Sequence, residues 1–177
     1  MDLNKIKTGK NPPEEVNVVI EIQANSSPVK HEFDKESGAL FVDRILSVAM
    51  YYPAHYGFIP KTISGDGDPA DVLVITDAPI MPGVVIAARP IGVLLMEDEA
   101  GQDEKILAVP TTKISPSCTH IKSYKDLPQI TLDKIKHFFE RYKDLEQGKW
   151  VKVVGWEGAE KAKSLISEAI VRFEKSV

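Results

Sequence analysis

The amino-acid sequence predicts an α+β fold: one domain with a small, mostly antiparallel β-barrel and two C-terminal helices packed outside it. Short apolar and β-branched runs fill the first two thirds of the chain, where repeated prolines exclude long helices. The last third changes to apolar spacings of three and four residues, the period of amphipathic helices. A small domain with many strands can remove its exposed edges by closing the sheet into a barrel.

The predicted strands are the apolar runs at residues 16–22, 29–35, 39–46, 71–76, 84–96, 105–110 and 150–156. Between the second and third runs, Glu36-Ser37-Gly38 is typical of a hairpin turn with Gly38 in the left-handed region. The polar stretch EDEAGQDE indicates a second hairpin loop. One helix is predicted from Thr131 toward a stop at Gly148, with apolar positions that include Leu145, and another from Ala159 to Phe173.

Length and composition restrict the class of protein. A chain of 177 residues suits a single domain spanning residues 1–177. The net charge of −4 argues against a general nucleic-acid binder. We see no signal-peptide-like start and no run of about 20 apolar residues for a membrane span. Cys118 is the only cysteine, so a cysteine zinc cluster is excluded, and the cytoplasm is the expected compartment.

An acidic turn, DGDPADV, carries the first functional signal. Asp66, Asp68 and Asp71 lie within six residues, beside an apolar run. Such carboxylates need a cation, and hard oxygen ligands match Mg²⁺, Mn²⁺ or Ca²⁺. A turn with solvated carboxylates is the competing interpretation, because Asp and Gly are common in turns. An EF-hand is disfavoured, since the third acid falls one residue late and no helices flank the turn.

Other polar side chains extend this signal. Asp98 and Asp103 lie near the two ends of one hairpin loop, and Glu21 lies inside an apolar strand. A barrel can bring these places to one mouth, where so many carboxylates would need more than one divalent ion. Cationic and phenolic donors that could accompany them are Lys30, Arg44, Lys105, Lys143, Tyr52, Tyr56 and Tyr142. This combination suits a small polyanion bridged to metals, and phosphate is the obvious chemistry. The four histidines are interpreted as structural or interfacial.

The residues resemble the soluble family I inorganic pyrophosphatases of the bacterial type. DGDPADV is similar to that family's signature turn. The likeness extends to EIQANSSPVKHEFDKESGALFVDR, YYPAHYGFIP, EDEAGQDEK and HFFERYKDLEQGKWVKV, and so covers nearly the whole chain. Differences from the usual pattern are Ala70, His31 and Arg141.

The resemblance implies an OB-like barrel, a homohexamer and hydrolysis of pyrophosphate to two phosphates by a water bridged between divalent metals, with Mg²⁺ favoured. It assigns Asp68 as general base and Asp66, Asp71, Asp98 and Asp103 as metal ligands. It assigns phosphate contacts to Lys30, Arg44, Tyr56, Tyr142 and Lys143. Supporting positions are Glu21, Glu32, Tyr52 and Lys105.

Two rival functions stay open at this point. A non-catalytic OB-type module could bind single-stranded nucleic acid through Lys, Arg and Tyr. The number of aspartates argues against it, so pyrophosphate is the expected partner, without nucleic acid or membrane. A metal enzyme acting on nucleoside polyphosphates is the second rival, and it lacks a visible base-stacking platform near the acidic turn.

Overall fold

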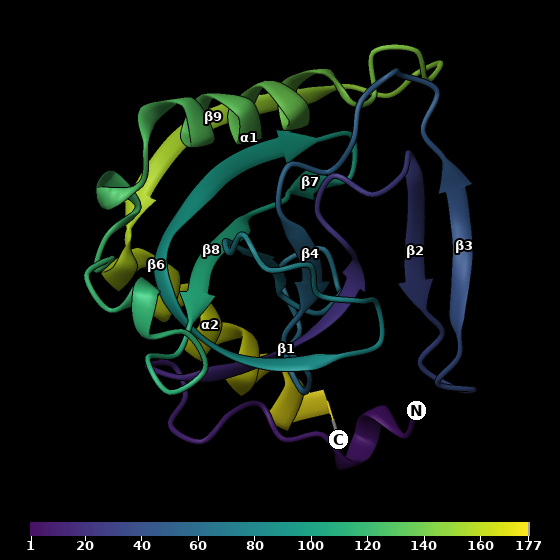
Figure 1. Ribbon diagram of the computed structural model, residues 1–177. Coiled ribbons are helices and arrows are strands. Elements are labelled where there is room, and N and C mark those ends of the chain that lie inside the picture. The colour runs from purple at the N-terminus through teal and green to yellow at the C-terminus, as the bar shows by residue number, and fades with distance from the viewer. Residues whose placement is uncertain (177) are drawn as a thin grey trace.

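A computed structural model describes residues 1–176 (Figure 1). The strands are β1 (Val16–Ile22), β2 (Val29–Phe33), β3 (Leu40–Ile45), β4 (His55–Phe58), β5 (Asp71–Val74), β6 (Val85–Asp98), β7 (Gly101–Gln102), β8 (Lys105–Pro110) and β9 (Val151–Gly158). The α-helices are α1 (Gln129–Arg141) and α2 (Ala159–Ser176). Short 3-10 turns are η1 (Leu3–Lys5), η2 (Pro116–Cys118) and η3 (Tyr124–Asp126).

The predicted barrel is confirmed. Strands β1, β4, β5, β8 and β6 pair in that order, and the sheet closes because β6 also pairs with β1. All of these pairings are antiparallel except β5 with β8. The long strand β6 additionally pairs with β7 and β9. The hairpin of β2 and β3 forms a separate sheet beside the barrel, and in Figure 1 it stands apart on the right.

Two apolar clusters hold the helices against the sheet. Alternate residues of β5 and β8 enter different clusters, because successive side chains of a strand point to opposite faces. Leu73 and Leu107 belong to the cluster that also contains Phe138 and Phe139 of α1. Val72 belongs to the cluster that contains the α2 residues. Burying such side chains contributes about 1.5–3 kcal/mol each. Among residues 1–176, no helix is both long and apolar enough to cross a membrane.

The predicted end of the first helix is wrong. α1 ends at Arg141, and Leu145 is 68% exposed rather than part of an apolar helical face. After Arg141 the chain tightens into successive turns, in which the N–H of Glu146 donates to the carbonyl of Lys143 at 2.9 Å. Gly148 then takes φ of +77° before β9 begins. This departure from the helix leaves both Tyr142 and Lys143 buried.

Strand β4 is absent from the prediction. It lies within YYPAHYGFIP, between Pro53 and Pro60, and all of its residues are buried. A short strand buried on both faces shows no polar alternation, so its period cannot be read. The hairpin prediction is confirmed: Gly38 has φ of +65° in the turn between β2 and β3. The second helix and the last strand also form where predicted, with α2 extending to Ser176.

Candidate active site

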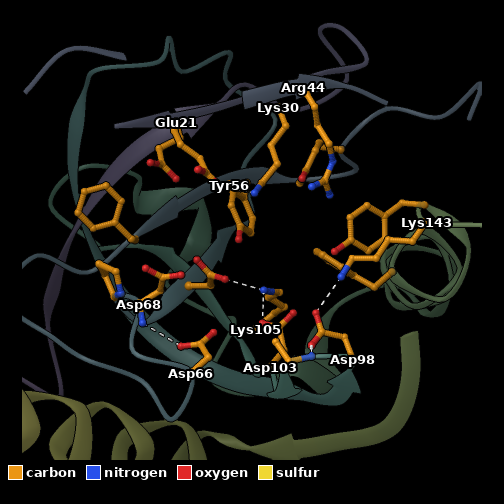
Figure 2. A pocket seen from close by; sticks show the side chains of 18 of the residues that line it. Glu21, Lys30, Arg44, Tyr56, Asp66, Asp68, Asp98, Asp103, Lys105 and Lys143 are labelled. Atoms are coloured by element: carbon orange, nitrogen blue, oxygen red, sulfur yellow. Dashed lines mark hydrogen bonds and ion pairs between the residues drawn. The ribbon is translucent and has the colours of Figure 1, made fainter. Parts of the chain in front are cut away.

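A pocket of about 330 Å³ lies where the barrel, the β2–β3 hairpin and the end of α1 meet. Figure 2 shows Lys30 and Arg44 reaching into it from the hairpin, opposite Asp66, Asp68 and Asp103. The structure brings all of the residues singled out by the sequence to its lining: Glu21, Lys30, Glu32, Arg44, Tyr52, Tyr56, Asp66, Asp68, Asp71, Asp98, Asp103, Lys105, Tyr142 and Lys143.

The acidic turn is held by its own backbone. Asp66 Oδ1 accepts a hydrogen bond from the N–H of Asp68 at 3.0 Å, and the N–H of Ser64 donates to the carbonyl of Asp68 at 2.6 Å. Gly67 between the aspartates has φ of +94°, in the region that glycine tolerates best. The exposed carboxylate of Asp68 accepts from Lys35 Nζ at 3.1 Å. The turn thus presents Asp68 to the open side of the pocket.

Lys105 occupies the floor of the site. The parallel register of β5 and β8 sets Asp71 directly beside Lys105. Lys105 Nζ donates to Asp71 Oδ2 at 2.5 Å and also to Asp103, and it lies 5.6 Å from the ring centroid of Tyr56. Burial lowers the pKa of Lys105, but Asp71 and Asp103 outweigh burial and hold the pKa well above its ordinary value. The ammonium therefore stays charged.

A second buried lysine, Lys143, pairs with the acidic residues between β6 and β8. Lys143 Nζ donates to Asp98 Oδ2 at 2.8 Å, and Glu99 Oε1 lies 3.4 Å from the same nitrogen. Burial acts to raise the pKa of Asp98, yet the hydrogen bonds from Lys143 and from the N–H of Ala100, with the charge of Lys143, together hold it below its usual value. Lys149 adds an ion pair to Glu99 at 2.7 Å. The end of α1 is thereby tied to the acidic loop.

Glu21 joins the barrel to the hairpin. It is 6% exposed on β1, and its Oε1 accepts a hydrogen bond from the N–H of Phe33 on β2 at 2.8 Å. Burial raises the pKa of Glu21 to about 8. The carboxyl group thus titrates far from the ordinary range of glutamate.

The hairpin supplies two cations side by side. Lys30 of β2 is paired in register with Arg44 of β3. Lys30 forms ion pairs with Glu32 and, at 3.4 Å, with Asp43. Burial lowers the pKa of Lys30, but the hydrogen bond to Glu32 and the charges of Glu32 and Asp43 together outweigh burial, so the pKa is raised. Both cations remain available as positive charge at the pocket wall.

Three tyrosines line the apolar side of the pocket. Tyr52, Tyr56 and Tyr142 are all buried, and burial raises the pKa of each phenol. Phe138 packs between two of them, with ring centroids 4.7 Å from Tyr52 and 5.2 Å from Tyr142. The phenols therefore stay neutral and able to donate hydrogen bonds.

The carboxylates are spread rather than gathered at one point. Within residues 1–176, no three acidic, histidine or cysteine side chains converge closely enough to hold an ion among them. Asp68 pairs with Lys35 and Asp71 with Lys105, which separates the like charges.

The sequence did not single out several lining residues. Lys35, Glu99 and Lys149 all face the pocket and pair with its charges. Their sequence context was uninformative, because Lys35 lies in a hairpin turn and Glu99 at a loop tip, where solvated charges are common. No histidine is among the pocket's lining residues. His55 is buried elsewhere: its Nδ1 accepts from the N–H of Ala24 at 3.2 Å, and its Nε2 lies 3.0 Å from the carbonyl of Ala78.

The whole chain is similar to known proteins in sequence. A model of the family described as inorganic pyrophosphatase matches residues 18–174. An inorganic pyrophosphatase of Bradyrhizobium diazoefficiens is 57% identical over 175 residues, which cover 99% of this chain and 98% of the relative. An Escherichia coli inorganic pyrophosphatase is also 57% identical, over 99% of this chain and 98% of its own length.

Solved structures agree with this likeness. The crystal structure of an inorganic phosphatase from Anaplasma phagocytophilum has a TM-score of 0.95 at 56% identity, covering 96% of this chain and 99% of that one. The inorganic pyrophosphatase of Thermus thermophilus has a TM-score of 0.93 at 42% identity, covering 98% of this chain and 99% of that one. Both neighbours extend over the barrel and the helices together.

Proposed function

The chain belongs to the inorganic pyrophosphatase family and hydrolyses pyrophosphate, and from this premise we propose how its own residues perform the reaction. Enzymes of this family depend on divalent metals, and we propose Mg²⁺ as the ion here. The observation that carries the residue assignments is the pocket itself, where carboxylates and ammonium groups alternate around one cavity.

The donor chemistry of the pocket fits divalent cations. Acidic side chains outnumber basic ones in its lining. Pyrophosphate is highly anionic, so a pocket with excess carboxylates would repel it unless further cations entered with it. Carboxylate oxygens are the ligands that Mg²⁺ prefers. Asp66, Asp71, Asp98 and Asp103 would hold these ions, with Asp71 and Asp103 exchanging contacts with Lys105 for contacts with metal.

Asp68 is proposed as the general base. When bound, the divalent ions would lower the pKa of the attacking water and withdraw charge from the phosphoryl oxygens. Asp68 suits the proton-accepting role because its carboxylate is exposed on the open side of the pocket, and its backbone is fixed by Asp66 and Ser64. Lys35, which pairs with Asp68 at 3.1 Å, keeps this carboxylate close to the cavity.

Cations and phenols would hold the phosphates. Lys30 and Arg44 approach from the hairpin and Lys143 from the turn after α1 (Figure 2), and Tyr142, next to Lys143 in sequence, also lines the pocket. With Tyr56 they surround the cavity on several sides, which suits a small anion rather than an extended strand. They would fix the phosphorus in line with the attacking water and stabilise the charge that develops on the leaving phosphate.

The rivals explain the pocket less well. A groove for single-stranded nucleic acid presents exposed aromatic faces along a basic surface, whereas Tyr52, Tyr56 and Tyr142 are buried in an acidic pocket. The same burial argues against stacking of a nucleobase, as a nucleoside polyphosphate would require.

The remaining expectations stay proposals. We propose that residues 1–177 act as one pyrophosphatase domain and that the enzyme works in the cytoplasm as a homohexamer. Exposed apolar side chains on β3 support self-association: Phe41 is 56% exposed and Ile45 is 68% exposed. Light scattering on the purified protein would test the hexamer, and a monomer at micromolar concentration would contradict it.

The central experiment is phosphate release from pyrophosphate, with Mg²⁺, with excess EDTA, and with ATP as a control substrate. We expect fast release from pyrophosphate that EDTA abolishes, with little release from ATP. Equal rates of phosphate release with Mg²⁺ and with EDTA would show that the four aspartates do not act as metal ligands in the reaction. Equal rates on ATP would favour the nucleotide alternative.

A further inference from the structure

Glu146 lies outside the pocket but touches one of its walls. It belongs to the turns between α1 and β9, and the pocket lining does not include it. Its backbone is fixed at both sides, because its N–H donates to the carbonyl of Lys143 and its carbonyl accepts from the N–H of Lys149 at 3.2 Å. The side chain is only 16% exposed, which is unusual for a glutamate in a turn.

Its partner is Arg44. Glu146 Oε1 lies 3.3 Å from Arg44 Nε, and both atoms are shielded from solvent. Within residues 1–176 neither atom has a hydrogen-bond partner of good geometry. Each is therefore the other's electrostatic partner, and removing Glu146 would leave the buried Nε of Arg44 without one, although Asp43 still pairs with a terminal nitrogen.

This contact determines which nitrogens of the Arg44 guanidinium are left to bind other groups. Because Glu146 pairs with Nε, the terminal nitrogens of Arg44 are left for other partners, and one of them, Nη1, lies 3.6 Å from Asp43 Oδ2. A planar guanidinium can bind phosphate through two parallel donors only when its plane is correctly oriented. The attraction between Glu146 and Nε restrains that plane at one edge, while Arg44 reaches into the cavity (Figure 2).

The contact also connects two separate parts of the fold. In the part of the chain that the structure describes, the β2–β3 hairpin shares no strand pairing with the barrel, whereas Glu146 follows Tyr142 and Lys143 in the same turn. This ion pair therefore links Arg44 of the hairpin to the turn that carries Tyr142 and Lys143.

We propose that Glu146 is a positioning residue for pyrophosphate binding, acting through Arg44 without touching the substrate. This inference rests on the phosphate-binding role proposed above for Arg44. Arg44 would hold phosphate both before and during reaction, so loss of its orientation raises KM more than it lowers kcat.

The test is a double-mutant cycle on the complete, Mg²⁺-loaded enzyme, with kcat and KM measured for pyrophosphate. Glu146→Ala is expected to raise KM roughly 10-fold with kcat within about threefold of wild type. In an Arg44→Ala background the same change is expected to alter KM less than about twofold, because the residue it acts through is gone. Glu146→Gln, which keeps the size and one acceptor oxygen, should raise KM by a smaller factor and covers the case in which Glu146→Ala folds poorly.

Asp144→Ala is the matched control. Asp144 lies in the same turn, but its exposed carboxylate pairs with Arg141 at 3.5 Å and is absent from the pocket lining. The KM of the Asp144→Ala variant should equal that of wild type. Equal effects of Glu146→Ala in both backgrounds, or none in either, would overturn the inference.

The two proposals fail separately. If Arg44→Ala raises KM but neither Glu146 variant does, only the positioning role is wrong. If Arg44→Ala leaves KM unchanged, Arg44 does not hold phosphate, and the role of Glu146 falls with it.

Discussion

Replacing Lys105 with methionine should destabilise the protein strongly. Lys105 is 4% exposed, and its Nζ is bonded to both Asp71 and Asp103. Methionine keeps much of the stem that packs near Tyr56 and Phe139 but removes the charge between two carboxylates. Those carboxylates are 23% and 13% exposed, so water can only partly replace the lost partner.

The expected loss of unfolding free energy in Lys105→Met follows from this burial. Breaking a buried ion pair by removing one partner costs about 3–5 kcal/mol, because it leaves an uncompensated charge. For a chain of this size, that loss lowers Tm by roughly 6–20 °C. Lys163→Met is the matched control: Lys163 pairs with Glu14 at 2.8 Å and Glu160 at 3.0 Å, but these carboxylates are 57% and 90% exposed. A surface pair of this kind contributes about 0–1 kcal/mol.

The assay is urea unfolding of both variants and wild type in EDTA, at one fixed protein concentration. The deficit of Lys105→Met should be largest near pH 7 and shrink toward pH 4. Burial already raises the pKa of Asp103, and loss of Lys105 raises it further, so the folded state gains a proton before the unfolded state does. Saturating Mg²⁺ should restore part of the loss. A Lys105→Met deficit no larger than that of Lys163→Met would refute the reasoning.

Three further predictions concern activity, pH and packing. Asp68→Asn should keep the fold and lower kcat by about 10²–10⁴ fold. Circular dichroism checks the fold and phosphate release checks kcat. Full activity of this variant would exclude Asp68 as the base. Burial lowers the pKa of His55, so the unfolded state binds its proton more readily, and stability should fall as pH drops below about 6.5. Urea midpoints from pH 5 to 8 check this, and His55→Gln should weaken the slope. Gly57→Ala should cost about 1–3 kcal/mol, since its Cβ would lie 2.0 Å from the carbonyl of Val19; Gly65→Ala, which meets nothing within 4 Å, should have little effect in the same unfolding assay.

The barrel could be predicted because periodicity and prolines are local signals, and the missed elements lacked such signals. β4 is buried on both faces, so it shows no alternation between Pro53 and Pro60. The end of α1 was misplaced because Leu145 continues the helical spacing while the chain has already turned at Tyr142. Only the surrounding pocket, where Tyr142 and Lys143 are buried, reveals why the helix stops early.

For the site, residue types could be predicted but not their partners. Asp71 and Lys105 are 34 positions apart, and the parallel register of β5 and β8 makes them neighbours. Lys143 and Asp98 are 45 positions apart, and meet because the end of α1 lies over the acidic loop. Such pairings depend on strand register and helix placement, which sequence spacing does not contain. Glu146 lies in one of the segments that carry the family resemblance, but no spacing singled it out, and its contact with Arg44 marks it in the structure.

The shared strand β6 has a consequence for how the chain folds. Residues 16–22 are synthesised before β6, so β1 can close the sheet only after β6, which ends at Asp98, has been made. At about 5–20 residues per second, this leaves the apolar β1 without that partner for roughly 4–15 s. β6 must in turn wait for β8 and β9, which follow it in the chain, so folding should be cooperative and slow for the chain's size, because its decisive contacts are far apart in sequence. The amide hydrogens of β6 should accordingly exchange last, because opening that strand dismantles the whole barrel.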